Sequence, residues 1–225
     1  MSNPLIVTLD GPAGVGKTSL ARKVAQALGI AYLDTGAMFR VTALKLGQGS
    51  WDLPGPELAA RLAAMSFGLE GVGEKSLLSC DGMPVGDEVR TEQVGMWASR
   101  LAARSEIRDF QKAAQRAMGA HTPLVAEGRD MGSVVFPEAR RKFFLDADPR
   151  VRAERRVEQL RAMGQSADLE AIEASIRQRD DLDRNRAIAP LAPAPDAIIV
   201  DTSKLDMEQV FTCIMGEIGG AAHAS

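Results

Sequence analysis

Cysteine and histidine are scarce, since the 225-residue chain holds two residues of each. Cys80 and Cys213 lie far apart without a C-x-x-C spacing, and His121 and His223 are equally isolated. Neither a disulfide framework nor a Cys/His metal site fits such spacing. Any bound metal is therefore expected to be a hard ion held by oxygen atoms.

Long hydrophobic runs are also lacking. The apolar runs reach about five residues, far short of the roughly 20 that a membrane span needs, and no charged and then apolar leader precedes the first of them. With 45% hydrophobic and 25% charged residues, the composition is typical of a globular protein and excludes disorder and collagen. We expect a monomer in the cytoplasm with no membrane partner.

A surplus of basic residues is absent as well. The net charge of −3 argues against a broad basic face, so we expect no nucleic-acid partner. Arginine nevertheless outnumbers lysine 20 to 7, and 16 of the arginines fall between Arg100 and Arg186. Because arginine holds a phosphate or carboxylate with two parallel hydrogen bonds, this bias favours small phosphorylated ligands, although a codon preference would explain it equally well.

Short apolar segments that end at an acidic residue recur along the chain. They are residues 5–9 before Asp10, 31–33 before Asp34, 124–126 before Glu127, 143–145 before Asp146 and 198–200 before Asp201. Such segments are typical of buried parallel strands, whose polar ends line the ligand crevice of an open α/β sheet. Helical patterns follow over 18–28, 36–46, 57–65, 91–119, 149–163, 168–184 and 206–218. The sequence therefore predicts an α/β fold with a parallel five-stranded sheet flanked by helices.

One stretch departs from this alternation. Residues 67–90 are rich in glycine, and Asp81-Gly82 is a strong hairpin signal, which predicts a small antiparallel β insertion. We expect a single unit with a core of about 1–60, 91–150 and 190–225, the insertion at about 61–90 and a helical lid at about 151–189. Residues 219–225 are expected to form a frayed tail.

A complete G-x-x-x-x-G-K-[ST] motif lies between the first predicted strand and helix. Glycines let backbone N–H groups surround an anion, the lysine neutralises the outer phosphates, and the threonine hydroxyl can bind Mg²⁺. The motif predicts an ATP site and a P-loop NTPase-type fold, with Thr18 as the metal ligand. The expected ATP-binding residues are Gly11, Pro12, Ala13, Gly14, Val15, Gly16, Lys17, Thr18 and Ser19.

The motif itself does not separate a GTPase, a motor, a transporter ATPase or a small-molecule kinase. A guanine-reading N-K-x-D motif is absent from the sequence, and the arginine-rich second half favours phosphoryl transfer to a small acceptor. No acid that assists Mg²⁺ can be chosen, because Glu127, Asp146 and Asp201 all end predicted strands.

Arginine-bearing clusters follow several of the predicted strands. Thr35 and Arg40 come after the second, and Arg129 and Asp130 come after the strand that ends at Glu127. These positions predict ligand contacts at the crevice, with a helix cap or a solvated side chain as the structural alternative.

Two further clusters fall on predicted helices. Arg152 and Arg156 could close over a triphosphate, or belong to a charged helix paired with its own glutamates. Asp183 lies about one turn from both Arg179 and Arg186, an arrangement suited to a ribose and a phosphate, with a solvated helix end as the alternative.

Taken together, these segments make the chain similar to the bacterial cytidylate kinases of the nucleoside monophosphate kinase superfamily. The matching motifs are D-G-P-A-G-V-G-K-T (10–18), Y-L-D-T-G-A-M-F-R (32–40), E-V-R-T (88–91), E-G-R-D-M-G-S-V-V-F-P (127–137), F-L-D-A (144–147), R-D-D-L-D-R-N-R-A-I-A-P-L (179–191) and I-I-V-D-T-S (198–203). The resemblance implies transfer of the γ-phosphoryl group of ATP to CMP or dCMP, with Mg²⁺.

The resemblance also implies roles for individual residues. Lys17 joins Arg40, Arg129 and Arg186 as the catalytic set, the three arginines clamping the acceptor phosphate. Ser99, Arg108 and Asp130 would read cytosine, and Arg179 and Asp183 would hold the ribose. From their places in the clusters above, Thr35 is expected to touch the substrate and Arg156 the ATP. The insertion would belong to the acceptor-binding region, and Phe39 stands where family members often carry tyrosine. A kinase for UMP, AMP or shikimate, or a nucleotide-binding regulator without turnover, remains as an alternative.

Overall fold

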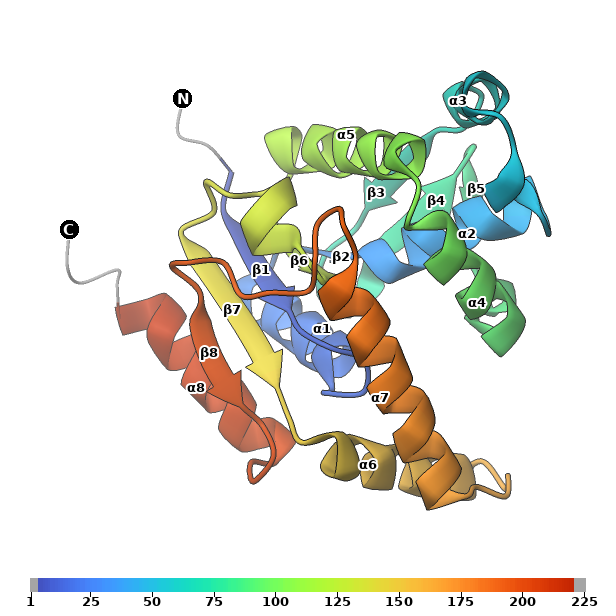
Figure 1. Ribbon diagram of the computed structural model, residues 1–225. Coiled ribbons are helices and arrows are strands. Elements are labelled where there is room, and N and C mark those ends of the chain that lie inside the picture. Colours follow the sequence, from blue (N-terminus) through green and yellow to red (C-terminus); the bar gives the residue numbers. More distant parts are fainter. Residues whose placement is uncertain (1–3, 221–225) are drawn as a thin grey trace.

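The computed structural model describes residues 4–220 and has a parallel sheet at its centre (Figure 1). Within those residues, five strands lie in the order β2-β6-β1-β7-β8. Their bounds are Ala31–Asp34 for β2, Leu124–Gly128 for β6, Ile6–Asp10 for β1, Arg141–Asp146 for β7 and Ile198–Asp201 for β8. The predicted strands and the α/β fold are confirmed, and each acidic residue lies within its strand, as the last residue or, for Glu127, the one before it.

Helices cover both faces of the sheet, because the strands are apolar on both sides. On one face, α1 (Lys17–Leu28) and α8 (Met207–Gly220) pack against β1, β7 and β8 through residues such as Leu20, Val24 and Ile214. On the other face, α2 (Thr35–Leu46), α5 (Ser105–His121) and a π-helical turn at Met131–Val135 pack against β2 and β6. The carboxyl ends of the strands are left for the loops.

The pairing of β1 with β6 aligns the phosphate loop with the loop that carries Arg129. Asp10 of β1 pairs with Gly128 of β6 at the last rung between these strands. The phosphate loop begins at Gly11 and the segment with Arg129 follows Gly128, so both loops leave the sheet from the same rung.

The single helix predicted over 91–119 is wrong, because two helices occupy that range. Helix α4 (Glu92–Leu101) ends at Leu101 and α5 begins at Ser105. Between them Arg104 has an extended backbone, and its guanidinium donates to the carbonyls of Trp51 (2.7 Å) and Leu53 (2.9 Å). Trp51 belongs to the turn Ser50–Asp52, and Leu53 lies between that turn and α3 (Gly55–Ala63). This long-range anchor breaks the helix, and apolar periodicity carries no signal for it.

The insertion is a small antiparallel sheet, as predicted. It consists of β3 (Phe67–Glu70), β4 (Leu77–Cys80) and β5 (Met83–Pro84). Asp81 and Gly82 both have positive φ, at 53° and 75°, which is the conformation of a tight hairpin turn. The sequence did not single out β3 as a strand.

The predicted lid segment forms two helices, α6 (Pro149–Ala162) and α7 (Leu169–Asn185), which lie side by side (Figure 1). Asp148 and Asp168 begin them by accepting backbone N–H groups of the first turn. Of the predicted tail, Gly219 and Gly220 belong to α8, and residues 221–225 lie outside the described residues. Among residues 4–220, no helix combines the length and apolar character that crossing a bilayer requires.

Candidate active site

The phosphate loop joins β1 to α1 in the geometry that the motif predicts. At Gly11 a Cβ atom would lie 2.1 Å from the carbonyl oxygen of Leu145, so only glycine allows this close approach. Gly16 precedes α1 with φ 87°, and among the described residues no side chain caps that helix. The first N–H groups of α1 are therefore free to hold an anion.

Lys17 is buried beneath this loop and donates to the carbonyl of Pro12 at 2.6 Å. Burial lowers the pKa of Lys17 to about 7, and the nearby charge of Arg129 lowers it further against the opposing charges of Glu127 and Asp10. A phosphate anion beside Lys17 would restore the charge of this amine. The lysine is thus matched to a negatively charged ligand.

Glu127, at the end of β6, meets the phosphate loop directly. Its Oε1 accepts the hydroxyl of Thr18 at 2.8 Å, and its Oε2 accepts the hydroxyl of Tyr32 at 2.6 Å. Burial raises the pKa of Glu127, and the charge of Asp34 adds to this effect. By contrast, Asp146 pairs with Arg184 and Asp201 accepts the backbone N–H of Ser203. Of the three acids that sequence could not separate, Glu127 is the one in contact with the phosphate loop.

The oxygen atoms of Thr18 and Glu127 fit a magnesium ion. Mg²⁺ prefers hard oxygen ligands, and it typically takes one or two from the protein and the rest from substrate phosphates and water. Within residues 4–220 no three His, Cys, Asp or Glu side chains form a metal-binding group of their own. The donor set therefore suits an ion that arrives with a nucleotide.

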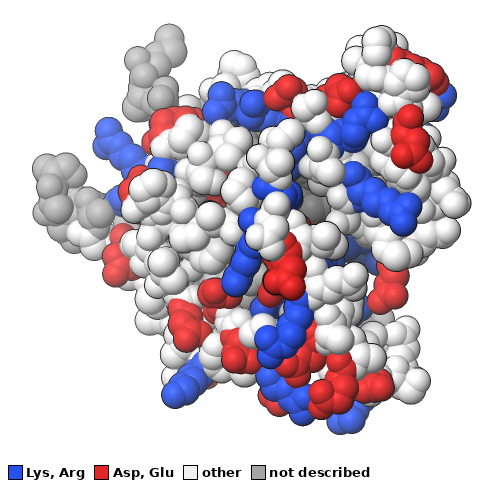
Figure 2. Space-filling view, in the orientation of Figure 1, with Lys and Arg blue, Asp and Glu red and all other residues white. Residues whose placement is uncertain are grey.

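A pocket lies beside the phosphate loop, with Glu127 in its wall. All of the residues expected to touch the acceptor come together here, from α2, α4, α5, the loop after β6, α7 and the segment after α7: Thr35, Arg40, Ser99, Arg108, Arg129, Asp130, Arg179, Asp183 and Arg186. Gly36, Phe39, Gly95, Ala98, Ala102 and Gly128 complete the wall. Figure 2 shows Lys and Arg side chains on both sides of a hollow near the centre of this face. The break between α4 and α5 lets Ser99 and Arg108 face the same pocket.

Two ion pairs organise the pocket floor. Arg108 donates to Asp130 at 2.8 Å, with both side chains buried, and Nε of Arg129 donates to Asp183 at 3.0 Å. Arg40 reaches the carbonyl of Val89 at 3.2 Å, so the end of the β insertion also borders the pocket.

Positive charge exceeds negative charge in this pocket. Among the described lining residues there are five arginines and three carboxylates. Burial lowers the pKa of Arg40, Arg179 and Arg186, and neighbouring guanidinium groups lower each further. The buried Nη2 of Arg186 has no hydrogen-bond partner among residues 4–220. A dianion such as a phosphate monoester would satisfy both the charge and this donor.

Arg156 lies apart from the pocket. Its side chain is exposed on α6 and donates to Gln159 at 2.8 Å, so its contact with ATP stays a prediction. Phe39 packs in the core around α2 to α5 while it lines the pocket, and it offers no hydroxyl there.

Sequence reasoning missed Asp10 and Tyr32. The two carboxylate oxygens of Asp10 accept the N–H groups of Met131 and Gly132, each at 2.8 Å, and so tie β1 to the loop after Arg129. Burial raises the pKa of Asp10 to about 6, while those two hydrogen bonds lower it and Asp130 raises it. Its position immediately before Gly11 was the available signal for Asp10. For Tyr32, within β2, the sequence carried none.

A phosphate loop on a parallel sheet, next to a pocket with surplus arginine, defines a P-loop kinase of α/β fold. The family model described as cytidylate kinase matches residues 7–219. The chain is 60% identical to a cytidylate kinase of Nitratidesulfovibrio vulgaris, covering 95% of this chain and 92% of the relative. It is 45% identical to the cytidylate kinase of Lawsonia intracellularis, covering 97% of both. The chain belongs to the cytidylate kinase family.

A solved structure shows the same fold at much lower sequence identity. An uncharacterized protein from Eubacterium ventriosum matches with a TM-score of 0.52 at 14% identity, covering 96% of this chain and 98% of that chain. At this identity the likeness concerns the fold alone.

Proposed function

We propose that the protein transfers the γ-phosphoryl group of ATP to CMP or dCMP, which gives ADP and CDP or dCDP. The observation that carries this proposal is the arginine-rich pocket that shares Glu127 with the phosphate loop. Membership of the cytidylate kinase family supports the choice of acceptor. It also makes a kinase for UMP, AMP or shikimate, or an inactive regulator, a poorer account of the chain.

Catalysis in this proposal rests on position and charge. The phosphate loop and Lys17 hold the outer phosphates of ATP, while Arg40, Arg129 and Arg186 hold the acceptor phosphate in line with them. Guanidinium groups fixed around a transferring phosphoryl group stabilise the charge that spreads over its oxygens. Magnesium, bound through Thr18 near Glu127, would neutralise phosphate charge and orient the triphosphate.

Arg108 and Asp130 offer a donor and an acceptor side by side, which suits cytosine. The Asp130 carboxylate can accept from the amino group of the base, while Arg108 can donate to its ring nitrogen and carbonyl oxygen. Uracil carries a carbonyl where cytosine has the amino group. It would therefore leave the Asp130 carboxylate without a donor, facing another acceptor oxygen. Ser99, which lines the same pocket, would assist, and Asp183 with Arg179 would hold the ribose.

This division predicts how selectivity is lost. Ser99→Ala or Arg108→Met is expected to reduce the preference for CMP over UMP, because the partner for the correct base is removed. The ratio of kcat/KM for the two acceptors measures it. An equal loss of kcat/KM with both acceptors would mean that Ser99 and Arg108 support the pocket without reading the base.

The activity is tested by coupled detection of ADP with ATP and Mg²⁺, and with CMP, dCMP, UMP, AMP, GMP and shikimate supplied separately. Strong selectivity for CMP and dCMP is expected. Turnover with another acceptor would keep the mechanism and overturn the base assignment. Silence with every acceptor, in protein that binds ATP, would favour the regulator. A monomeric state, a cytoplasmic location and the absence of a nucleic-acid partner remain predictions.

A further inference from the structure

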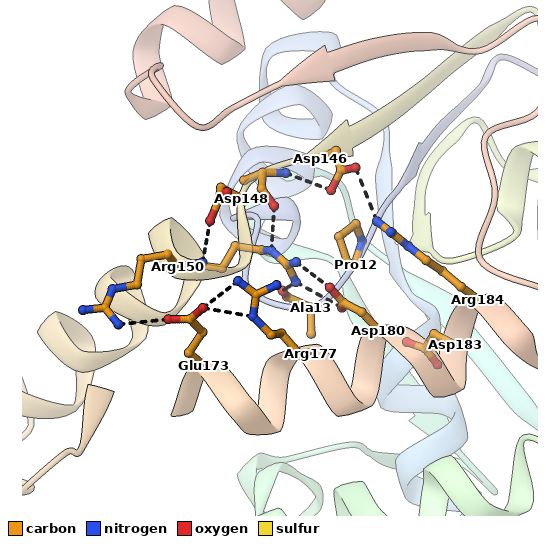
Figure 3. A network of polar contacts seen from close by, with 12 residues as sticks. Pro12, Ala13, Asp146, Asp148, Arg150, Glu173, Arg177, Asp180, Asp183 and Arg184 are labelled. Carbon is orange, nitrogen blue, oxygen red and sulfur yellow. Dashed lines mark hydrogen bonds and ion pairs between the residues drawn. The ribbon is translucent and has the colours of Figure 1, made fainter. Parts of the chain in front are cut away.

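The guanidinium group of Arg152 contacts both the phosphate loop and helix α7 of the predicted lid segment. Arg152 of α6 is 1% exposed. Its Nε donates to the carbonyl of Ala147 at 2.9 Å, and its Nη1 donates to the carbonyl of Ala13 in the phosphate loop at 3.1 Å. Both terminal nitrogens also pair with the buried carboxylate of Asp180 on α7. Figure 3 shows Ala13 and Asp180 close together at the centre of this network.

The packing around Arg152 supports the same conclusion. The stem of Arg152 lies against the phosphate loop, since a Cβ built at Gly14 would be 3.4 Å from the Cβ of Arg152. The side chain is therefore held by the loop, by the turn before α6 and by α7 together.

Arg150 provides a natural contrast on the same helix. It also pairs with α7, through Glu170 and Glu173, but its side chain is 42% exposed. Arg177 contacts the same Glu173, and Figure 3 shows Arg150, Glu173 and Arg177 meeting on one side of the network. For Arg150 the hydrogen bonds between side chains run to α7 and none reaches the phosphate loop within residues 4–220.

The partner of Arg152 sits among acceptor residues in the sequence of α7. Asp180 directly follows Arg179 and lies about one turn before Asp183, and both neighbours line the acceptor pocket. The rotation of α7 that Asp180 fixes therefore also aims Arg179 and Asp183.

We propose that Arg152 is a positioning residue that couples the two substrate sites: a nucleotide in the phosphate loop fixes the Ala13 carbonyl, which holds the Arg152 fork, Asp180 and hence α7 in the arrangement that binds the acceptor. This inference rests on the proposed function, because it assigns α7 to the acceptor. Coupling of this kind is reciprocal, so each substrate tightens the other. Arg152 acts in it through backbone and Asp180, without touching either substrate.

The test is the affinity for CMP, measured by calorimetry with and without saturating Mg²⁺ and a non-hydrolysable ATP analogue. In the unmodified protein we expect the analogue to tighten CMP binding by a factor within the common range of about 5 to 150. Arg150→Gln should leave unchanged the ratio of the CMP affinity with the analogue to the CMP affinity without it. Arg152→Lys keeps the charge but loses the two parallel hydrogen bonds that a guanidinium group makes with a carboxylate. The logarithm of the ratio should therefore fall to about half of its original value or less.

A second variant guards against misfolding. Removing one member of a buried pair leaves an unpaired charge, whereas replacing both with apolar residues is commonly tolerated. Arg152→Met combined with Asp180→Leu should bring the ratio to within about twofold of 1, while the analogue alone binds within about fivefold of its original affinity.

Three outcomes of the ratio measurement would overturn the inference. They are a ratio near 1 in the unmodified protein, an original ratio in both Arg152 variants, and an equal loss in Arg150→Gln. A collapse of analogue binding in Arg152→Lys would instead make Arg152 a direct ATP ligand and would also overturn the positioning role. The proposed function is judged separately by ADP release with CMP, which does not depend on any of these ratios.

Discussion

The arginines that line the acceptor pocket outnumber the carboxylates there, even though some of them form ion pairs, whereas Arg150, Arg152 and Arg177 between α6 and α7 each have a carboxylate partner. Among the described residues the pocket holds five arginines and three acids. In the α6 and α7 region, Arg150, Arg152 and Arg177 are paired with Glu173 or Asp180. Acidic and basic side chains alternate over that end of the molecule (Figure 2).

The pKa directions express the same contrast. Burial and neighbouring guanidinium groups lower the pKa of Arg179 and Arg186 in the pocket. Hydrogen bonds from Arg150 to Glu170 and then Glu173 raise the pKa of Arg150. Arginines left with surplus charge are prepared for a ligand, and arginines already neutralised hold helices together.

The largest expected effect is on turnover, when the positive charge of Lys17 is removed from the phosphate loop. Lys17→Ala should lower turnover by a factor of about 10² or more, because single electrostatic groups at a transition state contribute on that scale. Steady-state kinetics with ATP and CMP measure this effect. Unchanged turnover in a folded variant would remove Lys17 from the site.

Arg184, in the last turn of α7, and Arg186, just after that helix, test the comparison directly. Arg186→Ala should reduce kcat/KM for CMP by up to about 10², because the buried Nη2 of Arg186 has no partner among the described residues and would donate to the acceptor phosphate. Arg184 is half exposed and pairs with Asp146 at 3.5 Å, so Arg184→Ala should stay within about twofold. The kinetics with varied CMP at fixed ATP decide it. Similar losses in both variants would show that counter-charge does not distinguish the two kinds of arginine.

A pH series sharpens the role of Lys17. Its free-state pKa of about 7 means that the amine loses its proton above neutrality, while bound phosphate favours the protonated form. ATP affinity, measured without acceptor, should therefore weaken as pH rises from about 7 to about 9, by up to about tenfold per pH unit. Lys17→Met should flatten this slope. A slope that survives in Lys17→Met would assign the titration to another group.

The smallest effect is expected in the neutralised region. Arg150→Gln removes exposed ion pairs that water and salt already screen, so the thermal midpoint should fall by at most about 2 °C. Raising the salt concentration should shrink the difference further. A much larger fall in the melting curve would mean that these pairs hold α6 and α7 more firmly than exposed charges do.

Local patterns were sufficient for the sheet and the phosphate loop. Apolar segments that end in an acid predicted each strand of the parallel sheet, and the motif from Gly11 to Thr18 runs from the end of β1 into the first turn of α1. The hairpin at Asp81-Gly82 was likewise set by local turn chemistry. These features depend on neighbouring residues, which is why sequence alone predicted them.

The remaining features depend on partners far along the chain. Arg104 breaks a periodic helix by binding carbonyls about fifty residues away, those of Trp51 and Leu53. Arg152 and Arg156 looked equivalent in sequence, yet the first is buried against Asp180 and the second is exposed. The choice of Glu127 over the other strand-end acids needed its contact with Thr18. No local spacing reveals which arginine already has a counter-charge.

The shared rung of Asp10 and Gly128 has a consequence for how acceptor preference can change. Neighbouring strands lie about 4.8 Å apart, so backbone hydrogen bonds of the sheet set the spacing between the roots of the two phosphate-holding loops. Ser99 and Arg108 instead come from α4 and α5, helices that border the acceptor pocket and are not part of the sheet. Substitutions on those helices can alter the base that is accepted while the path of the phosphoryl group keeps its length.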